Sequence, residues 1–131
     1  MTVATAKIVQ ISDLNFELTL WLNELKFYKD EVAIFNSRLE EIVGRSTEQE
    51  FTSQLEHFQN QYIREIEVID ELRHDIKQYE NGIEKVSPDR PVTPEDNYMD
   101  GHKDLRDQMN QFRKIYYELR EEFINYLNQW I

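Results

Sequence analysis

Glu71 and His74 lie one helical turn apart and come nearest to a metal-binding motif in this sequence. A Glu-x-x-His spacing places a carboxylate and an imidazole on one face of a helix, as di-metal four-helix bundles require. Those bundles also need a second such motif and two further inward glutamates. We therefore expect both side chains to face water and the chain to hold neither metal nor cofactor. The alternative is a metal site that two copies assemble by dimerisation.

Glu65 is a second residue that could do chemistry, because its carboxylate interrupts an otherwise apolar pattern. Counting from the predicted turns places it level with Tyr28 and Tyr116, so two phenols could face one carboxylate. A buried carboxylate would be satisfied by these donors, or its pKa would rise if they missed it. The alternative, which we favour, turns Ile66 inward and leaves Glu65 at the rim of the core.

The remaining polar residues give no catalytic pattern. The sequence has no cysteine, its serines fall at predicted helix ends, helix surfaces and a loop, and no glycine-rich segment could hold a phosphate. His57 is far along the chain from His102, which occupies an apolar position near Tyr79. There a core histidine that donates to a carbonyl is the default expectation. We predict that the protein is not an enzyme.

Long helices are the elements that must position these residues. Apolar residues recur at alternating spacings of four and three, which is the pattern of a helix with one buried seam. Only Glu65 and His102 break the seams with a polar residue. The pattern predicts an all-α fold, an elongated up-down-up bundle of three long antiparallel helices. The expected helices cover 12–43, 47–84 and 94–131, after a possibly flexible extension over 1–11.

Capping residues mark the expected ends of these helices. Ser12 or Asp13 could cap the first helix, and Gly44 could end it in the left-handed conformation. Ser46 is the expected N-cap of the second helix. The proline-rich segment 86–94 is a connector, and Thr93 is the expected N-cap of the third helix.

A second set of apolar residues lies outside the seams. One seam cannot cover these positions, so they are typical of a surface that binds a partner or a second copy. The alternative is a wide stripe turned into the same core. The predicted interface consists of Phe16, Leu20, Phe27 and Ile34 in the first helix and Tyr117, Ile124 and Ile131 in the third.

Residues 18–25, with the sequence Leu-Thr-Leu-Trp-Leu-Asn-Glu-Leu, resemble the first helix of a spectrin repeat. In that family a core tryptophan is followed by leucine and an acidic residue. The proline-rich second connector departs from the family pattern, so the resemblance implies a shared way of packing helices.

Composition limits the possible partners. The 131 residues include 15 Lys and Arg against 26 Asp and Glu, and the net charge of −11 would repel nucleic acid and anionic membranes. The sequence predicts neither a signal peptide nor a membrane span, so we expect a soluble cytoplasmic protein. The predicted function is protein–protein interaction or self-association. Alternatives are the metal-binding bundle above and an acidic inhibitor or chaperone of a basic protein.

Overall fold

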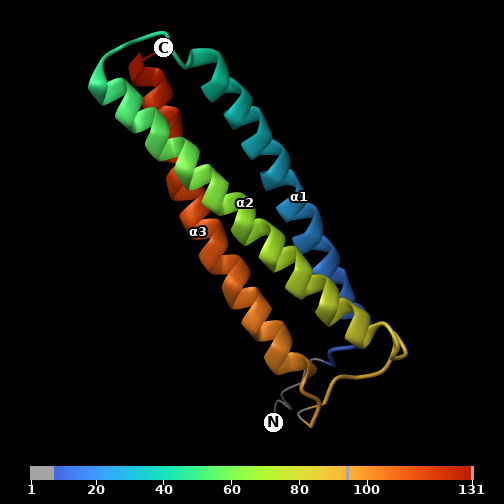
Figure 1. Ribbon diagram of the computed structural model, residues 1–131. Coiled ribbons are helices and arrows are strands. Elements are labelled where there is room, and N and C mark those ends of the chain that lie inside the picture. The colour runs from blue at the N-terminus through green and yellow to red at the C-terminus, as the bar shows by residue number, and fades with distance from the viewer. Residues whose placement is uncertain (1–7, 94, 131) are drawn as a thin grey trace, which may run out of the picture.

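The computed structural model describes residues 8–93 and 95–130 and shows three long helices packed side by side (Figure 1). They are α1 (Ile11–Ile42), α2 (Gln49–Ile83) and α3 (Tyr98–Trp130). The chain runs up, down and up, so α1 and α3 are parallel and α2 is antiparallel to both. The predicted all-α three-helix bundle is confirmed. No helix in the described ranges is long and apolar enough to cross a membrane.

The heptad seams form the core, as expected from their spacing. Nearly every seam residue is buried, and Phe35, Tyr79, Tyr98 and Trp130 are half-buried and pack against the others. Helices of 32 to 35 residues are about 50 Å long at about 1.5 Å per residue. Burial of such long apolar seams is the main favourable contribution to folding.

The N-terminal end of α1 is tied to the connector between α2 and α3. The helix begins at Ile11, which is fully buried, and the Gln10 backbone N–H donates to the Asp13 carboxylate at 2.8 Å. The Val92 N–H donates to the Val9 carbonyl at 2.7 Å. Residues 9–11 are therefore hydrogen-bonded to the rest of the fold, and α1 begins one residue before the expected start. Residues 1–7 lie outside the described residues.

The predicted starts of α2 and α3 are too early. Gly44 does take a left-handed conformation, with φ of +85°, and it ends the first helix as expected. Ser46 accepts a hydrogen bond from the Glu48 N–H at 3.1 Å, so α2 begins only at Gln49. Thr93 and Asp96 form a separate turn, in which each backbone N–H bonds to the other residue, and α3 begins after it at Tyr98. Pro94 is outside the described ranges.

Candidate protein-interaction face

A ladder of ion pairs joins the parallel helices α1 and α3. On each helix the charged residues recur every seven positions, and the partners in every rung are 89 residues apart. This heptad spacing of Glu and Arg is visible in the sequence, but the sequence analysis missed it. The rungs join Glu17 to Arg106 at 2.6 Å, Glu24 to Arg113 at 2.5 Å and Glu31 to Arg120 at 2.9 Å.

The middle rung is the best-formed pair of the ladder. The guanidinium of Arg113 donates to both carboxylate oxygens of Glu24, at 2.5 and 2.9 Å, and also to the amide oxygen of Asn110 at 2.8 Å. Burial raises the pKa of Glu24, but hydrogen bonds from Arg113 and Tyr28 outweigh it, so the pKa is lowered. A two-point contact of this kind fixes geometry as well as charge. It therefore favours the observed register of α3 against α1.

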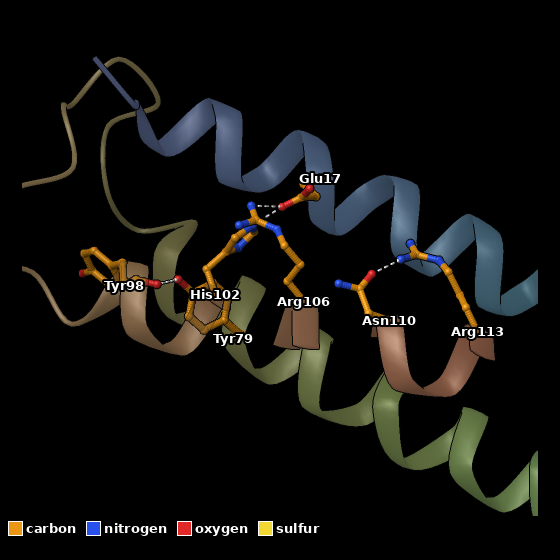
Figure 2. A network of polar contacts seen from close by, with 7 residues as sticks. All are labelled: Glu17, Tyr79, Tyr98, His102, Arg106, Asn110 and Arg113. Carbon is orange, nitrogen blue, oxygen red and sulfur yellow. Dashed lines mark hydrogen bonds and ion pairs between the residues drawn. The ribbon is translucent and has the colours of Figure 1, made fainter. Parts of the chain in front are cut away.

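The first rung includes the buried His102 (Figure 2). The Nε2 of His102 lies 2.5 Å from Glu17, which also accepts from Arg106. The imidazole stacks on Trp21, with 4.9 Å between ring centroids, and burial lowers its pKa more strongly than Glu17 raises it. At neutral pH the lowered pKa favours the neutral ring, and Nε2–H is the donor because the Glu17 carboxylate can only accept. The buried Nδ1 has no partner within the described ranges. The predicted partner, a backbone carbonyl, was wrong.

Tyr79 closes the same end of the bundle. Its hydroxyl donates to the backbone carbonyl of Tyr98 (Figure 2), and burial raises its pKa to about 12. The Tyr79 ring crosses α3 at Gly101, where an added Cβ would lie only 2.9 Å from the ring carbon Cε2. A larger residue at position 101 would therefore force the Tyr79 ring to shift.

The predicted grouping of Tyr28, Tyr116 and Glu65 was only partly right. The two tyrosine rings do meet, with 4.5 Å between their centroids. Their hydroxyls, however, donate to α1 carboxylates: Tyr28 to Glu24 at 2.8 Å and Tyr116 to Glu31 at 2.6 Å. Burial and these hydrogen bonds raise the pKa of both phenols.

Glu65 is buried, with 4% of its surface exposed, so its predicted place at the rim of the core was wrong. Ile66 is half-buried beside it and does not replace it in the seam. Burial raises the pKa of Glu65, and the charge of Arg64 opposes this rise. The residue lines a groove between α2 and α3.

Apolar side chains flank the ladder on the outer surface of α1 and α3. Phe27 contacts the ring of Tyr28 at 5.9 Å between centroids, and the Tyr28 and Tyr117 hydroxyls are 3.0 Å apart. Tyr117 of α3 therefore lies next to α1. Ile131 is not among the described residues. The other predicted interface residues form what we call the α1–α3 face: Phe16, Leu20, Phe27 and Ile34 of α1, with Tyr117 and Ile124 of α3.

This face is exposed in the isolated chain. Its four α1 residues are 50 to 67% exposed and Tyr117 is 51% exposed, whereas Ile124 is half-buried. The α1 stripe is therefore not turned into the core. At the end of α1 near His102, Phe16 and Leu20 line a shallow hollow of about 500 Å³ together with Glu17. The face thus has both apolar projections and a recess.

Glu71 and His74 are both exposed on α2, as predicted, and His57 is exposed on the same helix. Within 8–93 and 95–130, no three His, Asp or Glu residues lie close enough to hold a metal ion. In the part of the chain that the structure describes, Glu71 and His74 therefore do not form a metal site within one chain.

No protein-family model, curated protein sequence or solved structure matches this chain. Function must therefore be argued from the geometry of its own residues. The short likeness of residues 18–25 to a spectrin repeat concerns only how Trp21 packs in the core.

Proposed function

We propose that this chain is a non-enzymatic protein that acts by self-association through the α1–α3 face. The observation that carries the proposal is the exposure of large apolar side chains in one strip. Phe16 and Ile34 mark its ends on α1 and are 18 positions apart, about 27 Å along the helix axis. Aromatic and aliphatic side chains clustered on an otherwise polar helix surface are typical of protein interfaces.

Charge limits where on the surface a second copy can associate. Two copies of a chain with a net charge of −11 repel each other over most of their surfaces. Acidic residues outnumber basic ones along α2, whereas the six charges of the ladder cancel in pairs. The ladder lies directly beside the apolar strip. Association at this face therefore buries apolar surface beside a border whose own charges are balanced.

Helix geometry supports the same arrangement. The α1 side chains follow one another at spacings of four and seven, which keeps them within about 40° of each other around the helix axis. A straight strip of this kind fits along a helix of a second bundle by ridges-into-grooves packing. The paired arginines and glutamates at its border would form the polar rim that such interfaces usually have.

The two alternative functions have less support. Glu71 and His74 lie on α2, outside the α1–α3 face, so association through that face would not bring two copies of the motif together. An acidic inhibitor or chaperone of a basic protein rests on the net charge alone, and that charge also serves ordinary solubility. Neither alternative explains the exposed apolar strip.

Light scattering at micromolar concentration tests the proposal. The wild-type protein should have a mass above the 15.9 kDa of one chain, and the Leu20→Glu, Phe27→Glu double variant should fall to that value. Ile63→Glu is a matched control, because Ile63 is 57% exposed but lies on α2. A monomeric wild type, or equal dissociation of the control, would overturn the proposal.

A further inference from the structure

A groove of about 320 Å³ lies between α2 and α3 and has no part in the α1–α3 face. Its apolar walls are formed by Val68 and Leu72 of α2 and by Phe112 and Ile115 of α3. Ile115 is the exposed apolar residue of α3 that the α1–α3 face does not include. Apolar walls with a few polar groups are typical of small-ligand sites.

The Glu65 carboxylate lines this groove and lacks a partner. The residue as a whole is 4% exposed and makes no ion pair among residues 8–93 and 95–130, but its carboxylate oxygens are not fully enclosed and reach the solvent of the groove. The tyrosines that could have satisfied it donate to α1 carboxylates instead. A carboxylate at the floor of a largely apolar groove is only partly hydrated and therefore gains from pairing with a cation. The fold therefore holds a negative group ready for a cation.

The charges around Glu65 leave the groove acidic. Arg64, Glu71 and Asp75 are the other charged residues that line it, and all three are exposed on α2. The α3 wall contributes no charged residue to the described lining, because its polar members are the amides Gln108 and Gln111. With Glu65 ionised, carboxylates thus outnumber the single guanidinium.

We infer that the α2–α3 groove binds a primary alkylammonium group, whose charge pairs with the Glu65 carboxylate while its aliphatic stem lies against Leu72 and Ile115. A charged group with an apolar stem matches the two kinds of surface in the groove. A divalent metal ion fits less well, since Ca²⁺ and Mg²⁺ need about six or more oxygen ligands. No cluster of three candidate ligands occurs in the described ranges. The ammonium group can belong to a free amine or to a lysine side chain.

Titration followed by amide ¹H–¹⁵N NMR tests this site. The probes are n-butylammonium chloride, Nα-acetyl-lysine amide and, as the uncharged analogue, n-butanol, all at one ionic strength. With both ammonium probes, wild-type protein should show saturable chemical-shift changes at residues lining the groove. The probe that binds more tightly shows whether the natural ligand is a free amine or a lysine side chain. The Glu65→Gln variant keeps the side-chain shape. It should bind at least about tenfold more weakly, as expected for the loss of one charge-assisted hydrogen bond.

Glu67→Gln is the matched control, because Glu67 is an exposed glutamate of α2 outside the groove lining. It should bind like the wild type. Equal binding by the Glu65→Gln variant, equal shifts with n-butanol, or no saturable shift with either ammonium probe would each overturn the inference. Broadening of the groove signals by MnCl₂ in the wild type and its loss in the Glu65→Gln variant would replace the amine site with a metal site.

Discussion

Replacing Glu65 with leucine should stabilise the bundle at neutral pH. The side chain is 4% exposed, occupies a seam position and has no hydrogen-bond partner in the part of the chain described. Replacing a buried ion pair by apolar side chains of similar volume is often neutral or stabilising by about 1 to 4 kcal/mol, and the exchange of one unpaired carboxylate should act in the same direction. The groove beside Glu65 and the charge of Arg64 reduce its cost. We therefore expect about 1 to 2 kcal/mol, the lower half of that range.

The gain from Glu65→Leu should depend on pH. Above the ordinary glutamate pKa of 4.5 the unfolded chain releases the Glu65 proton, whereas the folded chain keeps it up to the raised pKa. In that window the folded state binds more protons than the unfolded state. The wild-type free energy of unfolding therefore falls as pH rises. Glu17 and Glu24 have lowered pKa values and the opposite slope below 4.5, but both proteins share them. The difference between the proteins should be small near pH 4 and largest at neutral pH.

Thermal and urea unfolding, followed by circular dichroism between pH 4 and 8, measure this difference. For a domain of this size, a gain of 1 to 2 kcal/mol corresponds to a rise of roughly 4 to 10 °C in melting temperature. The experiment should use a protein concentration at which wild type and variant have the same association state, since association also stabilises. A variant that is less stable than the wild type at pH 7, or a gain that does not change with pH, would refute this account of Glu65.

Two further predictions concern the core and the ladder. Trp21→Ala should cost about 3 to 5 kcal/mol of unfolding free energy, because it empties a buried position that stacks on His102. Phe16→Ala, which truncates an aromatic residue that is 67% exposed, should cost far less under conditions where the chain is monomeric, and equal melting temperatures would contradict the core assignment. A double-mutant cycle with Glu24→Gln and Arg113→Gln should give a coupling free energy of about 1 kcal/mol in urea unfolding, near the upper end for exposed ion pairs. The value is high for such a pair because the two side chains share two hydrogen bonds and are about 70% buried. A coupling near zero would show that this rung of the ladder adds no net stability.

The fold could be predicted from the sequence because the spacing of the apolar residues largely determines it. The heptad spacing identified the buried side of each helix, and Gly44 marked the first turn correctly. The helix ends were less predictable, since they depend on which of several polar residues captures a free backbone N–H. Asp96 captures the N–H of Thr93 in a separate turn, so the start of α3 moved to Tyr98.

The polar contacts between helices were harder to predict than the seams. Tyr28 and Tyr116 were correctly placed together, but a register estimate good to about one turn cannot choose between carboxylates on different helices. Their hydroxyls bonded to α1, and Glu65 was left buried without a partner. The ladder could have been found by searching for opposite charges with the same heptad spacing on the two parallel helices. That these charges cancel in pairs beside the α1–α3 face could be seen only in the structure.

Protection of a single thiol tests the central claim most directly, that a second copy covers the α1–α3 face. The chain has no cysteine, so Ile34→Cys introduces a unique thiol in the face and Ile63→Cys introduces one on α2. The rate of alkylation by a small maleimide is measured across a dilution series of each protein. The account predicts that the thiol at position 34 reacts more slowly as protein concentration rises, whereas the thiol at position 63 reacts at a constant rate. Rates that are independent of concentration at both positions would contradict it.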